Sequence, residues 1–118
     1  MKLKRVVVTG LGALTPVGNT VAETWENLVN GVSGAGPITR FDASKFKTQF
    51  ACEVKNFNVA DFIDRKEARK MDLYAQYAIV AAKEAIEDSA MDLESVDKNK
   101  IGVIFGVGIG GIRTFEEE

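Results

Sequence analysis

The residues best suited to chemistry or to binding fall in three places along the chain. Segment 65–70, Arg-Lys-Glu-Ala-Arg-Lys, carries four positive charges against one negative charge, segment 106–111 is rich in glycine, and Cys52 is the single thiol. Histidine is absent, so no imidazole in these 118 residues can act as a general base. One thiol without an imidazole cannot supply the roughly four ligands of a zinc site, and no metal or cofactor site is predicted.

Cys52 is predicted to be structural rather than reactive. Phe50, Cys52 and Val54 alternate with Ala51, Glu53 and Lys55, which is the pattern of a short half-buried strand. On such a strand the thiol would point into the core as a small apolar group. Because no histidine or basic side chain adjoins it to activate the thiol, Cys52 is not proposed as a nucleophile.

The basic segment contrasts with the charge of the whole chain. The 15 basic and 17 acidic side chains leave a net charge of −2, which gives no support to nucleic-acid binding. If the segment is helical, Lys66, Arg69 and Lys70 stand at i, i+3 and i+4 and project together. They could then bind carboxylate or phosphate groups of a partner, and the alternative is an ordinary solvated helix face.

The glycine-rich segment admits two interpretations. Gly106, Gly108 and Gly111 match the G-x-G-x-x-G pattern of dinucleotide-binding proteins and follow a predicted strand. That hypothesis also needs an acidic residue about 20 positions further on, which lies beyond these 118 residues. The alternative is that the glycines allow positive φ and close backbone approach without a ligand.

Two apolar runs and two helical patterns predict the elements that position these residues. Segments 5–9 and 101–105 are β-branched or apolar and stop at glycines, which is typical of strands buried on both faces. A capping box begins a helix at Thr20, and Gly31 is placed to end it. Its apolar face is Val21, Trp25, Leu28 and Val29.

A second helical region is predicted to begin near Asp64, followed by a longer helix from about Asp72 to Asp88. Small residues line one face of the longer helix, which suits close packing. This face is Tyr74, Ala78, Ala81, Ala82 and Ala85. Strands that alternate with helices predict an α/β fold with a largely parallel sheet.

The composition is that of a soluble globular protein, with 46% apolar and 27% charged residues. The longest uncharged apolar stretch, 101–112, is interrupted by glycines and is shorter than the roughly 20 residues of a membrane-spanning helix. The apolar run after the basic N-terminus is too short for a signal peptide. We therefore expect a cytoplasmic protein without a membrane span.

Five motifs in register resemble one family, the 3-oxoacyl-[acyl-carrier-protein] synthases. They are Val-Val-Val-Thr-Gly-Leu-Gly-Ala-Leu-Thr-Pro-Val-Gly-Asn at 6–19, Trp25 followed by Gly31 and Ser33-Gly34, Phe41-Asp42, Arg-Lys-Glu-Ala-Arg-Lys-Met-Asp at 65–72, and Gly-Val-Gly-Ile-Gly-Gly at 106–111. The resemblance covers nearly the whole chain and is greatest to the type II members. It implies that residues 1–118 are an incomplete N-terminal portion of a beta-ketoacyl synthase N-terminal domain.

The resemblance implies a thiolase-like fold, layered α-β-α-β-α, in a much longer chain that forms a homodimer. Such an enzyme is an acyltransferase of fatty acid biosynthesis. A cysteine takes the acyl group from acyl carrier protein as a thioester, two histidines assist decarboxylation of malonyl-carrier protein, and the product is a 3-oxoacyl-carrier protein. The family's cysteine comes later than Cys52 and both histidines are missing here, so no catalytic residue is predicted in this chain and the chain alone is expected to be inactive.

Two roles carry over by resemblance. Lys66, Arg69 and Lys70 match the docking positions for the acidic carrier protein, and Ile109 matches the residue that lines and gates the acyl-chain pocket. Two alternatives to a condensing enzyme remain. The chain could be a non-catalytic module that docks the carrier protein, or a fragment of a nucleotide-binding oxidoreductase. Exposed apolar surface around 101–112 is further expected to cause self-association or a rearranged fold.

Overall fold

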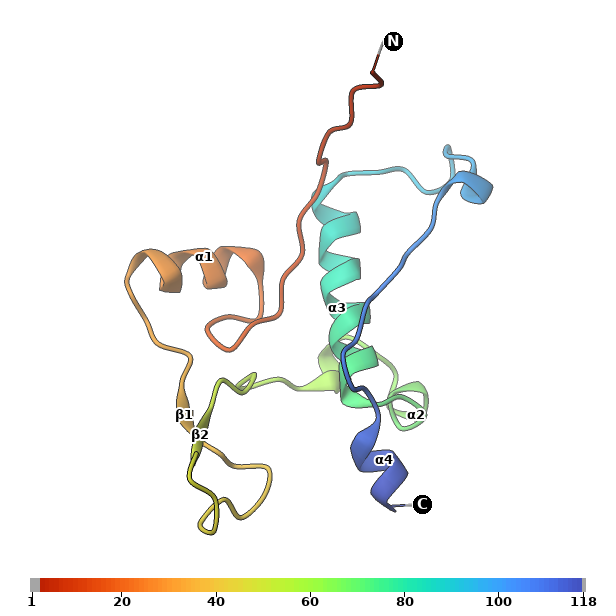
Figure 1. Cartoon of the computed structure of the whole chain (residues 1–118). Coiled ribbons are helices and arrows are strands. Elements are labelled where there is room, and N and C mark those ends of the chain that lie inside the picture. Colours follow the sequence, from red (N-terminus) through yellow and green to blue (C-terminus); the bar gives the residue numbers. More distant parts are fainter. Residues whose placement is uncertain (1–2, 118) are drawn as a thin grey trace.

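The longest helix, α3, spans Leu73–Asp88, and the other segments of the chain are arranged around it (Figure 1). The computed structural model describes residues 3–117. The other helices and strands are α1 (Val21–Val29), β1 (Gly36–Pro37), β2 (Phe50–Ala51), α2 (Arg65–Ala68) and α4 (Ile112–Glu117), with 3₁₀ turns at Val59–Asp61 and Lys98–Lys100. The architecture is therefore mixed helix and sheet, dominated by helices.

Helix α1 forms where the capping box predicted it. The Thr20 hydroxyl accepts a hydrogen bond from the Glu23 amide at 3.2 Å, and the Glu23 carboxylate accepts one from the Asn19 amide at 2.7 Å. These bonds satisfy backbone donors that no helical carbonyl can reach. Gly31, at φ 68°, follows the C-terminus in the left-handed region that glycine adopts most easily. Both predicted ends of this helix are confirmed.

Helix α3 also matches its predicted bounds, and its small face does allow close approach. The extended segment around Gly10 and Gly12 runs along the helix at Ala81 and Ala85 (Figure 1). A Cβ atom added to Gly12 would lie 1.9 Å from the carbonyl oxygen of Ala81. The contact therefore needs both a glycine on the segment and a small residue on the helix.

Two acidic side chains of α3 fix the loop that leads into α1. Glu84 accepts hydrogen bonds from the amides of Ala13 and Val21, both at 2.8 Å. Asp88, one turn further along, accepts one from the amide of Leu11 at 2.8 Å. Charge-assisted bonds of this kind are stronger than neutral ones, so this loop is tied to α3 at three backbone positions.

The predicted central strands at 5–9 and 101–105 are wrong for this structure. Both segments are extended but pair with no neighbour within residues 3–117, and the sheet consists of β1 and β2, paired antiparallel. A strand needs an adjacent backbone to complete its hydrogen bonds. The side chains are correspondingly exposed, at 90% for Val6 and 96% for Ile104.

Two predicted faces also differ from the structure. Cys52 is exposed rather than buried, because no second layer covers that side of the β1–β2 pair in the described residues. On α1 the buried residue is Thr24, whereas Trp25, Leu28 and Val29 face solvent. Thr24 packs inward because its hydroxyl bonds to the 15–18 turn, at the Thr15 hydroxyl and the Gly18 carbonyl.

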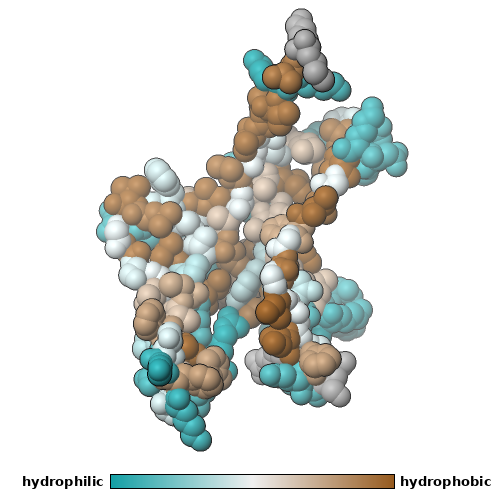
Figure 2. Space-filling model, viewed as in Figure 1, coloured by the Kyte–Doolittle hydropathy of each residue, from teal (hydrophilic) through white to brown (hydrophobic). Residues whose placement is uncertain are grey.

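Apolar surface is extensive on this chain. Figure 2 shows it along the N-terminal extended segment, over α1 and along the segment that leads to α4. Among the described residues only Ala43, Ala68 and Val80 are buried apolar side chains. Within residues 3–117, no helix has the length and apolar character needed to cross a bilayer.

Candidate functional site

The basic residues singled out from the sequence lie on and just after α2. Asp64 caps this short helix by accepting a hydrogen bond from the Lys66 amide at 2.8 Å. Ala68 faces inward and is only 5% exposed, whereas Lys66, Arg69 and Lys70 are all exposed. We call these three cations the basic patch, and a role for them in docking a partner stays a prediction.

Gln76 of α3 holds the end of the basic segment in place. Its side-chain amide donates to the carbonyl oxygens of Ala68 and Met71, both at 3.0 Å. These carbonyls flank Arg69 and Lys70, which continue from the last turn of α2. The Ala68 carbonyl also accepts from the Met71 amide at 3.2 Å, and Gln76 adds a second donor there and a donor to the Met71 carbonyl beyond the helix end. The sequence analysis did not identify this residue.

The cations of the basic patch are not equivalent. Lys70 Nζ lies 2.9 Å from the Glu67 carboxylate, in an exposed ion pair within the same segment. Lys66 and Arg69 form no ion pair with any described residue. Two cations are therefore open to an external anion, and the third already has an internal one.

The glycine-rich loop, residues 106–111, contacts the N-terminal end of α3. This end of α3 follows the basic patch directly in the sequence. Gly110 lies against the ring of Tyr74, and Gly111 lies against the carboxylate of Asp72. The Thr114 hydroxyl, on α4, donates a hydrogen bond to that same carboxylate. Asp72 is two residues from Lys70, so α2, α4 and the loop gather at one end of α3 (Figure 1).

Ile109 lies in this loop and is 87% exposed. It lines neither of the two hollows described below. The wall of an acyl pocket, predicted for this residue by resemblance, would need apolar groups opposite it. The role of Ile109 in an acyl pocket therefore stays a prediction, and what the structure gives is that the neighbouring Gly110 and Gly111 contact Tyr74 and Asp72 at the start of α3.

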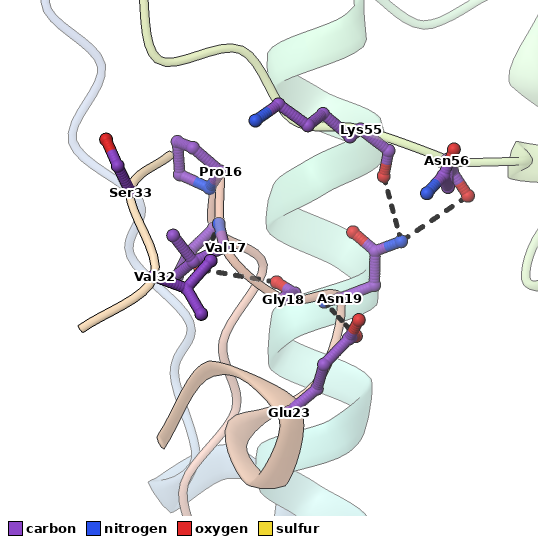
Figure 3. Close-up of a pocket in the computed structure, with 10 residues that line it drawn as sticks. Pro16, Val17, Gly18, Asn19, Glu23, Val32, Ser33, Lys55 and Asn56 are labelled. Atoms are coloured by element: carbon purple, nitrogen blue, oxygen red, sulfur yellow. Dashed lines mark hydrogen bonds between the residues drawn. The ribbon is translucent and has the colours of Figure 1, made fainter. Parts of the chain in front are cut away.

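One hollow, of about 160 Å³, lies between the 15–19 turn and the chain at 55–56 (Figure 3). Asn19 donates its side-chain amide to the carbonyls of Lys55 and Asn56, at 3.0 and 3.4 Å. Lys55 in turn donates from Nζ to the Gly34 carbonyl at 3.0 Å. These polar groups therefore hold segments of this chain together, and each already has a partner.

A second hollow, of about 310 Å³, lies beside α3 and the 3₁₀ turn at 59–61. Phe62, Val80, Lys83 and Glu84 are among its lining residues. Glu84 is occupied by the two backbone amides described above. In the part of the chain that the structure describes, no group of three or more acidic or cysteine side chains is placed to bind a metal ion.

Two carboxyl groups have a pKa below the ordinary value, that of the exposed Asp42 and that of the half-buried Glu53. Hydrogen bonds from the side chain and then the backbone of Thr39 lower the pKa of Glu53, and burial opposes this slightly. The Ser44 amide lowers the pKa of Asp42. Asp42 lies in the loop that joins β1 and β2, and Glu53 follows β2 and bonds to Thr39 just after β1, so both groups stabilise local structure around this strand pair.

Comparison with known proteins defines the class of this chain. The sequence model of the beta-ketoacyl synthase N-terminal domain matches residues 3–118. A protein of Staphylococcus aureus (strain COL), 3-oxoacyl-[acyl-carrier-protein] synthase 2, is 54% identical over 113 residues, which are 96% of this chain and 27% of that protein. The protein of the same name in Synechocystis is 47% identical over the whole chain, which matches 28% of its length.

Solved structures of ketosynthases resemble the described fold. The ishigamide ketosynthase/chain length factor has a TM-score of 0.69 and 37% identity, over 76% of this chain and 22% of that one. A second solved structure is a type II PKS acyl-carrier protein in complex with its ketosynthase, bound to the hexaketide. It has a TM-score of 0.63 and 28% identity, over 83% of this chain and 24% of that one.

The chain belongs to the beta-ketoacyl synthase family, and its residues 3–118 match the N-terminal domain of that family. It spans just over a quarter of the length of the curated relatives named above. Family membership replaces the dinucleotide-binding alternative for Gly106, Gly108 and Gly111.

Proposed function

We propose that this chain is the N-terminal portion of an elongating condensing enzyme of fatty acid biosynthesis. The enzyme would join malonyl-carrier protein to an acyl group and give a 3-oxoacyl-carrier protein that is longer by two carbons. The observation that carries this proposal is the family match over residues 3–118, with curated relatives named 3-oxoacyl-[acyl-carrier-protein] synthase 2. No catalytic residue of that reaction is assigned to this chain.

The chemistry would be a decarboxylative Claisen condensation. Loss of CO₂ from the malonyl thioester leaves a carbanion, which attacks the carbonyl carbon of an acyl group held on a cysteine. The new carbon–carbon bond forms as the cysteine thiolate leaves. The cysteine and the two histidines of this scheme lie outside these 118 residues, which contain no histidine.

The role of this portion would be to dock the carrier protein and to form part of the acyl channel. The basic patch offers cations to an acidic carrier, and Ile109 would face the acyl chain that the carrier delivers. What supports this pairing is that both lie at the same end of α3, joined through Asp72. A ketosynthase relative has been solved together with its acyl-carrier protein.

The larger architecture is part of the same proposal. The apolar segments 5–9 and 101–105 would be strands of the thiolase-like α-β-α-β-α arrangement, in a cytoplasmic homodimer. Exposed apolar side chains on both faces of these segments support this, because strands covered on both sides by helices have that composition.

Charge reversal of the basic patch tests the docking role in the full-length protein. The substitutions Lys66→Glu, Arg69→Glu and Lys70→Glu together should weaken binding of an acidic acyl carrier protein by about tenfold or more, measured by calorimetry. Exposed ion pairs are worth roughly 0.2–1 kcal/mol each, and about 1.4 kcal/mol corresponds to tenfold.

The matched control reverses three exposed lysines away from α2, Lys45, Lys47 and Lys83, and so changes the net charge equally. Carrier binding by this control should stay within about twofold of the unmodified protein, because distant exposed charges are largely screened. An equal loss of carrier binding in the patch variant and in the control would show that only the net charge matters. Unchanged binding by the patch variant would remove the docking role.

A further inference from the structure

Glu67 is the one acidic residue inside the basic segment, and its side chain bonds to Lys70. The carboxylate and Lys70 Nζ are 2.9 Å apart, and the two side chains are 55% and 68% exposed. Glu67 stands three residues after the capping Asp64, where a glutamate can bond back to the backbone of the cap. Its recorded partner is instead one cation of the basic patch.

The segment that carries Glu67 and Lys70 is held by hydrogen bonds at both of its ends. Asp64 caps the beginning of α2, and Gln76 holds the carbonyls of Ala68 and Met71 at its end. These bonds hold the backbone that carries Glu67 and Lys70, and so keep the two side chains within reach of each other. A partner carboxylate that binds Lys70 therefore competes with Glu67 for the same ammonium group.

Replacement of Glu67 by a partner carboxylate at Lys70 requires a small amount of free energy. An exposed ion pair is weak, so an incoming carboxylate can replace Glu67. Displaced Glu67 then remains beside the bound acidic partner, and like charges at close distance repel. Lys66 and Arg69 have no such internal competitor in the described structure.

We propose that Glu67 is an internal competitor that keeps the affinity of the basic patch for an acidic carrier protein low. The inference rests on the docking role proposed above. A carrier protein that must be released after each delivery benefits from weak binding, and a partner with few carboxylates does not displace Glu67. The glutamate therefore acts on both release and selectivity.

The substitution Glu67→Gln in the full-length protein tests this. It removes the negative charge and keeps the size of the side chain, and it should tighten binding of an acidic carrier protein by about threefold at low ionic strength, with a smaller gain at high salt. Calorimetric titration measures both. Glu67→Ala, which retains high helix propensity, should give the same direction.

The matched control is Glu94→Gln. Glu94 forms an exposed ion pair with Lys98 at 3.3 Å, so this change removes the same charge from the same kind of pair elsewhere. It should leave carrier binding unchanged. A gain equal to that of Glu67→Gln would attribute the effect to net charge and overturn the inference.

A double-mutant cycle isolates the part that acts through Lys70. In a protein carrying Lys70→Gln, the additional change Glu67→Gln should give clearly less than its threefold gain. A full gain in that background, or no gain in the unmodified one, would overturn the competitor role. If the triple charge reversal described above also leaves binding unchanged, the docking role itself fails. If the reversal abolishes binding while Glu67→Gln has no effect, this inference alone fails.

Discussion

Gly12 shows how one residue type decides a contact in this chain. Its Cα lies so close to α3 that an added Cβ would be 1.9 Å from the Ala81 carbonyl oxygen and 2.7 Å from the Ala85 amide nitrogen. Both are backbone atoms of a helix, which cannot move away by a rotamer change as a side chain can. The glycine is therefore required by packing, independently of any ligand.

The substitution Gly12→Ala should lower the free energy of unfolding by about 3 kcal/mol, at the upper end for overpacked sites, because the segment must move away from α3. Urea denaturation followed by circular dichroism measures this. Gly102→Ala is the control, since nothing lies within 4 Å of a Cβ atom there, and its effect should stay within about 0.5 kcal/mol. A small effect at Gly12 would mean that the segment is not held against the helix.

At the scale of elements, Gln76 links α3 to α2. It provides two hydrogen bonds to the carbonyls of Ala68 and Met71, across a junction that has little apolar packing beyond Ala68. Without Gln76 the Ala68 carbonyl would keep the Met71 amide as a donor, whereas the half-buried Met71 carbonyl would lose the bond from Gln76, which raises the free energy of the folded state. The arrangement predicts that Gln76 keeps the last turn of α2, with Arg69 and Lys70, in its observed conformation.

The substitution Gln76→Leu should speed amide hydrogen exchange at Lys70 and Met71 about tenfold, because losing bonds worth about 1.4 kcal/mol or more allows local opening. Gln49→Leu is the control. Gln49 also donates its amide to two carbonyls, those of Ser44 and Phe46, but in the loop between β1 and β2. Exchange at α2 that is equally fast in both variants would show that Gln76 has no specific role there.

The sequence predicts helices better than strands for a physical reason. The ends of α1 and α3 depend on local signals, such as the Thr20 and Glu23 capping box, and these were confirmed. A strand depends on a neighbouring backbone, so the apolar pattern at 101–105 identifies an extended segment without identifying its partner. For the same reason the inward position of Cys52 was predicted wrongly, since burial depends on what covers the residue.

The candidate site was predictable in part. The i, i+3, i+4 spacing identified Lys66, Arg69 and Lys70, and all three are exposed together. Glu84 and Gln76 were not identified, because each acts on backbone atoms of a segment distant in sequence. A signal for Glu84 does exist, since a carboxylate beside the small face formed by Ala81 and Ala85 needs donors from whatever packs there.

At the scale of the whole molecule, the chain is open. Its radius of gyration is 17.5 Å, whereas a compact domain of this length has about 13.5 Å. Its accessible surface is 9946 Å², compared with about 6,300 Å² for a folded monomer of this mass. The apolar segments 5–9 and 101–105 contribute to this surface, since Val6 and Ile104 are 90% and 96% exposed and neither segment pairs as a strand within residues 3–117.

An open chain of this kind should self-associate. Segments 5–9 and 101–105 combine β-branched and apolar side chains with unpaired backbone groups, and such edges bind other strands. Sedimentation velocity of the 118-residue chain should show a mean mass that rises with concentration. Ile104→Lys should reduce this association, because a lysine in an edge segment opposes pairing.

Ile109→Lys distinguishes strand pairing from general apolar attraction. Both isoleucines are highly exposed, at 96% for Ile104 and 87% for Ile109, but only Ile104 lies in one of the extended apolar runs predicted as strands. If association proceeds by strand pairing, the change at Ile104 should reduce it clearly more than the change at Ile109. Equal reduction would indicate non-directional contact between apolar patches, and a chain that remains monomeric at high concentration would show that these segments find partners within the chain itself.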